Sequence, residues 1–169
     1  MVLKELFDRI FQVNNALRTY FTKNFKRSLP TGDLYSDRWE KAKGLGFDEG
    51  SSIYDSTYII GNVEVGSICW VGMFTILDGS GNLKIGNNCT ISAGCHIYTH
   101  DNVKTTLGPT NQEIQRNPVV IGNNVYIVPK SIISKGIQLG DKMLVAASSF
   151  VNKSFRNNLS FTIMFKMIY

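Results

Sequence analysis

The sequence has no long apolar run. Its apolar stretches fall well short of the roughly eighteen uncharged residues that a membrane-spanning helix needs. Lys4, Glu5, Asp8 and Arg9 stand where a secretory signal peptide would be apolar. We therefore expect a cytoplasmic protein, and contact with a membrane is disfavoured.

Histidine and cysteine are scarce. The chain has two histidines, His96 and His100, and three cysteines, Cys69, Cys89 and Cys95, without a C-x-x-C pair. Structural zinc sites and disulfide frameworks need more of these residues at closer spacing. We expect neither a disulfide framework nor a bound metal.

The chain also lacks a concentrated basic surface. The net charge is +5, and Lys23, Lys26 and Arg27 form the tightest basic group. Nucleic-acid binding therefore receives little support. With 169 residues, 43% hydrophobic and 18% charged, the composition is that of a globular domain with an appendage.

A six-residue repeat of aliphatic side chains runs from Ile59 to Val151. A spacing of six fits neither a helix nor simple strand alternation, so the repeat is a unit in itself and predicts a parallel β-helix with three hexapeptides per coil. Its members are Val65, Val71, Leu77, Ile85, Ile91, Ile97, Ile121, Ile127, Ile133, Leu139, Val145 and Val151.

The residue four positions after each aliphatic residue should also point inward. These positions hold only small or apolar side chains and no charge, namely Cys69, Thr75, Cys89, Cys95, Val125, Ser131, Ile137, Met143 and Ser149. All three cysteines belong to this set. Buried free cysteine behaves as a small hydrophobic residue, so we expect the cysteines to have a packing role.

The repeat is interrupted twice. Leu77 and Ile85 are eight positions apart, and Ile97 and Ile121 are twenty-four apart. Both interruptions follow the third strand of a coil, so they should leave the same edge of the prism, one coil apart. Loops on a rigid scaffold commonly hold functional residues, and this edge is the candidate site.

The remaining chain divides into flanking segments. We expect an N-terminal helical segment over residues 1–50, the β-helix over 51–154 with an inserted loop at 98–118, and an atypical apolar tail at 155–169. Helical apolar spacing from Val2 to Phe25 predicts a helix that packs on the β-helix or on a neighbouring subunit, with a membrane surface as the alternative. A turn is expected at 30–33 and a short helix over Ser36 to Lys43.

His100 is the candidate catalytic base. It lies at the root of the inserted loop and is followed by Asp101. An imidazole titrates near neutral pH, and a carboxylate such as Asp101, or another in the loop, can fix its tautomer. Asp78 and Tyr98 lie near His100 by the edge argument and are candidate contacts for the acceptor; Asp78 could equally be a turn former.

Three stretches resemble the hexapeptide-repeat acyltransferases, and in particular the bacterial sugar O-acetyltransferases of surface-polysaccharide synthesis. These stretches are SDRWEKAKGLGF (36–47), ILDGSGNLKIGNNCTISAGCHIYTHD (76–101) and VVIGNNVYIVPKSIISKGIQLGD (119–141). The resemblance implies a mainly β fold, a left-handed parallel β-helix that assembles as a homotrimer with sites between subunits. It also implies transfer from acetyl-CoA without an acyl-enzyme, with His100 as the base.

By position, the resemblance implies CoA contacts from five residues: Tyr126, Pro129, Ala147, Asn152 and Lys153. Lys135, Lys142 and Lys153 are candidate partners for the CoA phosphates. Family members usually end with an apolar strand and a glycine-proline turn that help to hold CoA, and residues 155–169 contain neither.

The resulting hypothesis is acetyl-CoA-dependent O-acetylation of a sugar hydroxyl in lipopolysaccharide, capsule or other surface-polysaccharide synthesis. One alternative is N-acetylation of an amino-sugar nucleotide, and another is a non-catalytic trimeric scaffold. A zinc carbonic anhydrase, which also occurs on β-helix trimers, needs three histidine ligands and is disfavoured by the two histidines.

Overall fold

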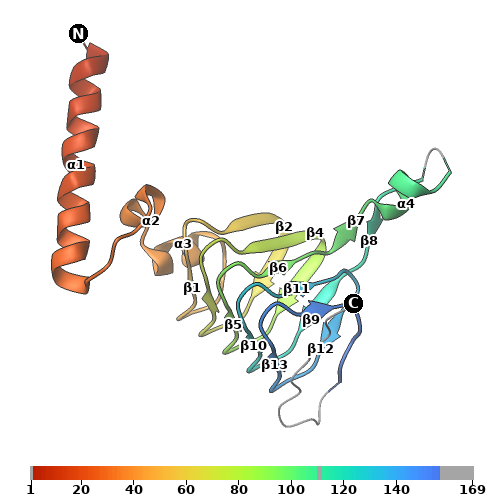
Figure 1. Cartoon of the computed structure of the whole chain (residues 1–169). Coiled ribbons are helices and arrows are strands. Elements are labelled where there is room, and N and C mark those ends of the chain that lie inside the picture. The colour runs from red at the N-terminus through yellow and green to blue at the C-terminus, as the bar shows by residue number, and fades with distance from the viewer. Residues whose placement is uncertain (1, 110–111, 157–169) are drawn as a thin grey trace.

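Residues 51–155 of the chain form a three-sided parallel β-helix (Figure 1). The structure is a computed structural model that describes residues 2–109 and 112–156. The first face consists of β1 (Ser52–Ile53), β3 (Trp70–Val71), β5 (Thr90–Ile91), β10 (Tyr126–Ile127) and β13 (Leu144–Val145). This arrangement confirms the predicted β-helix.

The other two faces share their first strands. β2 (Tyr58–Val65) and β4 (Ile76–Ile85) each run along both faces and bend at the edge between them. The second face continues with β6 (His96–Ile97), β11 (Ile132–Ile133) and β14 (Phe150–Val151), and the third with β9 (Val119–Ile121) and β12 (Gln138–Leu139).

The aliphatic repeat stacks in register, as predicted. Val71 pairs with Ile91, Ile91 with Ile127, and Ile127 with Val145. Each of these side chains is at most 1% exposed, and the nine intervening inward positions, cysteines included, are buried as well. The six-residue period therefore builds a single apolar column, and burial raises the pKa of the Cys95 thiol within it.

The corners between faces use left-handed backbone. At the corner before the first face, Ile68, Asn88 and Asn124 have φ of 58°, 53° and 57°. Asn88 Nδ2 donates to Asn124 Oδ1 at 2.7 Å, so these side chains stack from coil to coil. Asparagine tolerates this conformation, whereas a β-branched residue such as Ile68 is strained there.

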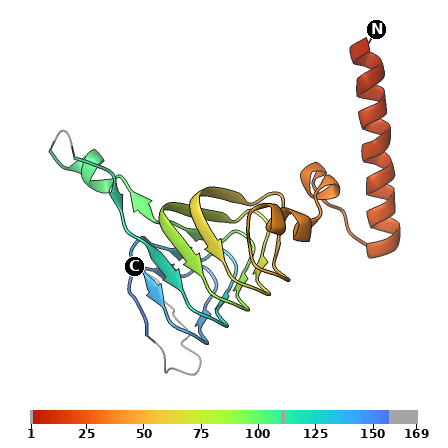
Figure 2. The ribbon, with the colours of Figure 1, turned by 180° about the vertical axis from the view of Figure 1, so that it is seen from behind.

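The inserted loop leaves the edge between the second and third faces and projects away from the prism (Figures 1 and 2). It contains β7 (His100–Asp101), α4 (Val103–Leu107) and β8 (Gln115–Arg116), and β7 pairs with β8 in antiparallel orientation. Directly beneath it, the 78–82 bulge of β4 contacts the root of the loop: Gly81 N–H donates to Thr99 Oγ1 at 2.7 Å. The predicted adjacency of the two insertions is confirmed.

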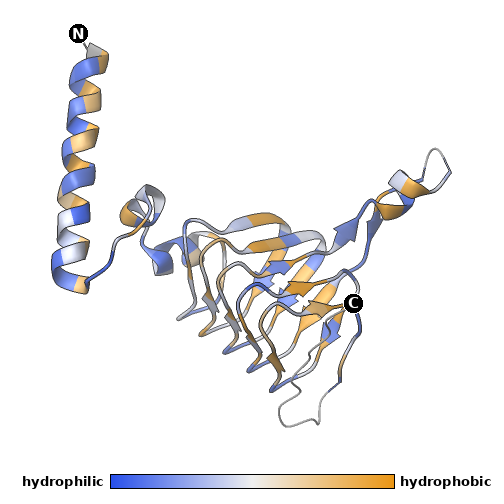
Figure 3. Cartoon of the chain, in the orientation of Figure 1, coloured by the Kyte–Doolittle hydropathy of each residue, from blue (hydrophilic) through white to orange (hydrophobic). Residues whose placement is uncertain are grey.

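The N-terminal segment differs from expectation in its packing. α1 (Val2–Phe25) continues unbroken through Asn14 and Asn15, but it packs against α2 (Thr31–Tyr35) and stands away from the β-helix (Figures 1 and 2). Most of its large apolar side chains are exposed, and apolar residues recur along the whole length of the helix (Figure 3). Of the two expected partners, the β-helix of its own chain is therefore wrong, and a neighbouring subunit stays a prediction.

The short elements after α1 are also shifted from their predicted positions. The stretch expected to be a turn at 30–33 is the first part of α2, because Thr31 to Tyr35 complete a helical turn. The helix predicted over Ser36 to Lys43 is α3 (Arg38–Gly44). It begins later because Asp37 caps it, accepting hydrogen bonds from the N–H groups of Trp39 and Glu40.

The start of the C-terminal tail still belongs to the prism. Phe155 pairs with Leu139 of β12, and the Gly140 N–H donates to its carbonyl at 2.8 Å. Its ring packs against the core, so Phe155 takes the third-face position of the last coil rather than opening the tail. The rest of the predicted tail, residues 157–169, lies outside the described residues.

Candidate active site at the loop edge

The structure joins His100 and Asp78 at the root of the inserted loop. His100 Nδ1 lies 2.7 Å from Asp78 Oδ2. The Asp78 side chain is 0% exposed and that of His100 is 37% exposed, so the carboxylate is inside and the ring reaches the surface. Counted from the coil that begins with β1, Asp78 comes from the bulge of the second coil and His100 from the third coil, which stacks directly on it.

Asp78 accepts an unusually complete set of hydrogen bonds. Its Oδ1 accepts from the N–H and hydroxyl of Ser80, and its Oδ2 accepts from the N–H and hydroxyl of Thr99 as well as facing His100. Burial opposes the charged form, but the bonds from Ser80, Thr99 and His100 outweigh it and hold the pKa of Asp78 well below its usual range. The carboxylate is therefore ionised.

An ionised Asp78 fixes the tautomer of His100. Because a carboxylate can only accept, Nδ1 must carry the proton that lies between the two residues. In the neutral ring the lone pair is then on Nε2, the nitrogen that points away from Asp78. The pair thus has the arrangement of a general base supported by a buried carboxylate.

Asp101 has a different partner. Its Oδ2 lies 2.9 Å from Lys135 Nζ, which also donates to Gln115 Oε1 at 3.0 Å. The bond from Lys135 lowers the pKa of Asp101. The structure therefore directs Asp101 to Lys135, and the carboxylate that contacts the imidazole is Asp78. Lys135, a candidate for CoA phosphates, instead joins the loop to the fourth coil.

Tyr98 lies beside the site, where its side chain contacts His96. Its hydroxyl is 3.3 Å from His96 Nδ1, and the two rings meet edge to face. Both side chains sit on the second face and are half-buried. His96, the other histidine of the chain, therefore lies on the surface next to the site.

The five residues predicted to contact CoA are all exposed, but they lie in separate places. Pro129 and Ala147 stack at one corner, where the Ser148 N–H donates to the Pro129 carbonyl. Asn152 and Lys153 follow β14 on the edge that also bears His100, two coils further on, which is about 10 Å along the prism. Tyr126 lies on the first face. One chain alone does not gather them into a single site.

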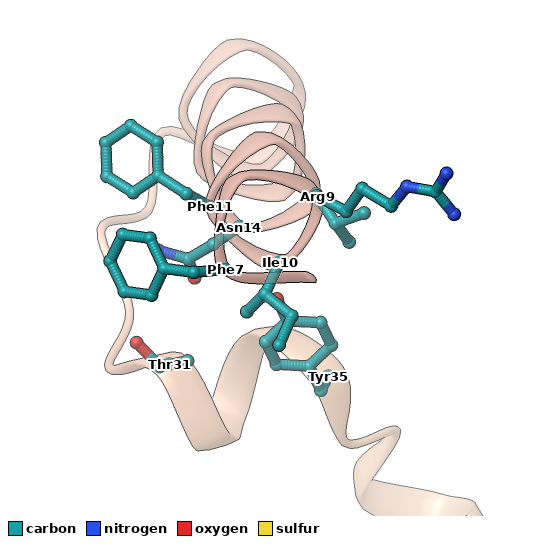
Figure 4. A pocket seen from close by; sticks show the side chains of 8 residues that line it. Phe7, Arg9, Ile10, Phe11, Asn14, Thr31 and Tyr35 are labelled. Carbon is teal, nitrogen blue, oxygen red and sulfur yellow. The ribbon is translucent and has the colours of Figure 1, made fainter. Parts of the chain in front are cut away.

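An apolar pocket lies far from this edge. It has a volume of about 490 Å³ and lies between α1 and α2, as Figure 4 shows. Its lining contains Phe7, Ile10, Phe11 and Tyr35 but neither His100 nor Asp78.

Within residues 2–109 and 112–156, no three His, Cys, Asp or Glu side chains cluster as metal ligands would. Over the same residues, no helix has the length and apolar character to cross a bilayer.

Sequence comparison finds related curated proteins but no matching family model. The chain is 30% identical to the carnitine operon protein CaiE of Escherichia coli O7:K1 over 109 residues, which cover 62% of this chain and 55% of the relative. It is 31% identical to the galactoside O-acetyltransferase of Escherichia coli K12 over 86 residues, 46% of this chain and 42% of the relative. The chain spans about half the length of the curated relatives it matches.

Structural comparison gives the fold. A hexapeptide-repeat acetyltransferase from Vibrio cholerae superposes with a TM-score of 0.54 and 21% identity over 84% of this chain and 82% of that one. The chain has the fold of the hexapeptide-repeat acyltransferases. AntD, an N-acyltransferase from Bacillus cereus solved with dTDP and 3-hydroxybutyryl-CoA, superposes with a TM-score of 0.58 and 22% identity over 66% of this chain and 63% of that one. The predicted resemblance to this family is confirmed.

Two features of the site escaped the sequence reasoning. The bond between Asp78 and His100 joins residues from different coils, although the edge argument had already placed them close together. The Lys135 tie also crosses from one coil to the next. A signal for the fixed position of Asp78 was present in the DGSGN stretch, because an aspartate in a turn commonly accepts a hydrogen bond from the backbone N–H two residues on.

Proposed function

We propose that the protein is an acetyl-CoA-dependent O-acetyltransferase that acts on a sugar hydroxyl, in surface-polysaccharide synthesis. The observation that supports this best is the hydrogen bond of His100 Nδ1 to the buried, ionised Asp78. The similarity to a galactoside O-acetyltransferase favours a hydroxyl acceptor over an amine. The fold is also that of acyltransferases.

In the proposed reaction, Nε2 of His100 takes the proton of the acceptor hydroxyl as its oxygen attacks the thioester carbonyl of acetyl-CoA. The tetrahedral intermediate collapses with loss of the CoA sulfur, and the imidazolium returns its proton to that thiolate. Asp78 stabilises the imidazolium and keeps the ring oriented. The acetyl group passes directly from sulfur to the sugar oxygen.

The complete site is proposed to form between subunits of a homotrimer. The separate positions of Pro129 with Ala147 and of Asn152 with Lys153 support this proposal. Two neighbouring prisms can bring a corner of one chain to an edge of the next, so that acetyl-CoA lies in the groove between them. Lys153 would then offer a cation to the CoA phosphates.

The test is acetyl-CoA-dependent thiol release with a panel of sugar acceptors. General base catalysis contributes roughly 10²- to 10⁴-fold, so His100→Ala should lose turnover by that factor and keep its affinity for acetyl-CoA. His96→Ala is the matched control and should retain most turnover, because its ring contacts Tyr98 rather than the Asp78 dyad. Turnover that survives in His100→Ala would contradict the assignment, and a wild-type protein that never releases thiol would contradict the function.

A further inference from the structure

The ribbon formed by β7 and β8 has two faces with different surroundings. Asp101 pairs across it with Gln115, and Lys135 binds both side chains, so this pair faces the fourth coil. Side chains alternate along a strand. The other pair, His100 and Arg116, therefore shares the opposite face, the one that meets Asp78.

The hydrogen-bond pattern sets how close His100 and Arg116 are. The Asn117 N–H donates to the Thr99 carbonyl at 2.9 Å, which makes that pair hydrogen-bonded. Pairs alternate along an antiparallel ladder, so His100 and Arg116 form a non-hydrogen-bonded pair, with Cα atoms about 4.5 Å apart and adjacent side chains. Arg116 also lies against the bulge, since a Cβ built on Gly81 would be 3.2 Å from the Arg116 Cβ.

The charge of Arg116 is not compensated. Its side chain is exposed, and within residues 2–109 and 112–156 no carboxylate lies within ion-pair distance of it. The two carboxylates at the root of the loop are engaged: Asp78 with His100, and Asp101 with Lys135. An arginine beside the base, with its guanidinium free, is therefore placed to meet a charge on the substrate.

We propose that Arg116 binds a negatively charged group of the acceptor, a phosphate or a carboxylate, and makes the site selective for anionic sugars. This inference rests on the proposed function, because it assumes that the acceptor hydroxyl sits at His100. The planar guanidinium binds carboxylate or phosphate oxygens through two parallel hydrogen bonds. The negative group must then lie within about one arginine side chain of the hydroxyl that is acetylated.

Binding to the full-length protein is the first test and needs no turnover. Inorganic phosphate, dTDP and galacturonate are titrated separately while the imidazole proton resonances are followed by NMR. The chain has two histidines, so His100 is assigned by comparison with a His96→Gln variant. At least one probe should shift the His100 resonances, and the probe that does so distinguishes a phosphate from a carboxylate source.

Arg116→Gln should weaken that binding by roughly ten- to a hundredfold, the range for losing a charged hydrogen-bonded contact. Lys104→Gln is the matched control, since it removes one positive charge from α4 of the same loop, and it should bind the probe as wild type does. The proposal is overturned if none of the three probes affects His100, or if Arg116→Gln binds as tightly as wild type.

Kinetics then separates this inference from the proposed function. Thiol release is compared for galactose, galactose 1-phosphate and galacturonate. Arg116→Gln should raise KM for the preferred anionic acceptor about tenfold or more, leave kcat nearly unchanged, and leave KM for acetyl-CoA and the rate with galactose unchanged. If the wild-type protein acetylates galactose as well as the anionic acceptors, and Arg116→Gln does the same, the inference alone is contradicted. If no acetyl transfer occurs with any acceptor, the proposed function is contradicted.

Discussion

Replacing Asp78 by asparagine tests the dyad with minimal change in shape. The carboxylate accepts bonds at both oxygens, and an amide has only one acceptor. The amide oxygen should turn toward Thr99 and His100, where the donors are most numerous, leaving its NH₂ against the Ser80 N–H. A half-buried donor then loses its acceptor, which costs about 1 kcal/mol, the low end of the range for a fully buried group.

The larger effect of Asp78→Asn should be on catalysis. Without the negative charge, the imidazolium that forms during the reaction is no longer stabilised, and the Nδ1–H tautomer is no longer enforced. Turnover in the thiol-release assay should fall by roughly 10²- to 10⁴-fold, with KM for acetyl-CoA nearly unchanged. Turnover within threefold of wild type, roughly 0.7 kcal/mol by the same arithmetic, would refute the reasoning.

The pH dependence of unfolding provides the control for stability. The folded-state pKa of Asp78 is below the unfolded value of about 3.9, so its contribution is present above that pH and is lost as pH falls through the folded pKa. The gap in Tm between wild type and Asp78→Asn should narrow as the pH falls below about 4, where Asp78 loses its advantage over the unfolded carboxyl group. A gap that instead widened as the pH fell below about 4 would show that Asp78 is not held ionised.

Two further substitutions test the scaffold. Lys135→Met removes the ion pair with Asp101 and should loosen the placement of the loop. We expect kcat to fall by roughly three- to tenfold and KM for acetyl-CoA to stay unchanged. A large rise in that KM would instead assign Lys135 to CoA binding. Ile68→Asn relieves a β-branched residue at φ 58° and can extend the stack of Asn88, so it should stabilise by about 1 kcal/mol and raise Tm by roughly 2–4 °C in a thermal melt. A lower Tm would show that the contacts of the Ile68 side chain stabilise the protein by more than its strained backbone conformation destabilises it.

The β-helix could be predicted because its physics is local and periodic. Inward positions such as Val71 and Ile91 must be apolar in every coil, so their spacing alone gives the stack and the edge at which both insertions leave. The same reasoning placed Asp78 beneath His100. It could not assign the hydrogen bond between them, because that depends on side-chain orientation across coils.

The role expected for Asp101 shows where adjacency misleads. A residue next to the base in sequence is a natural partner, but β7 is a strand, and successive side chains of a strand point to opposite faces. Asp101 therefore turns to Lys135 while His100 turns to Asp78. The position of α1 could not be predicted for another reason. An amphipathic pattern indicates that one face of a helix is apolar enough to be covered, but it does not identify what covers that face.

The tautomer of His100 is the most direct test of the central claim, that a buried carboxylate presents this imidazole as a base. Nitrogen-15 chemical shifts of the two histidine side chains report which ring nitrogen carries the proton. They are recorded on the intact protein at a pH high enough for both imidazoles to be neutral. The account predicts a protonated Nδ1 and an unprotonated Nε2 for His100 in wild type, with loss of this preference in Asp78→Asn. A wild-type His100 protonated on Nε2 would contradict it.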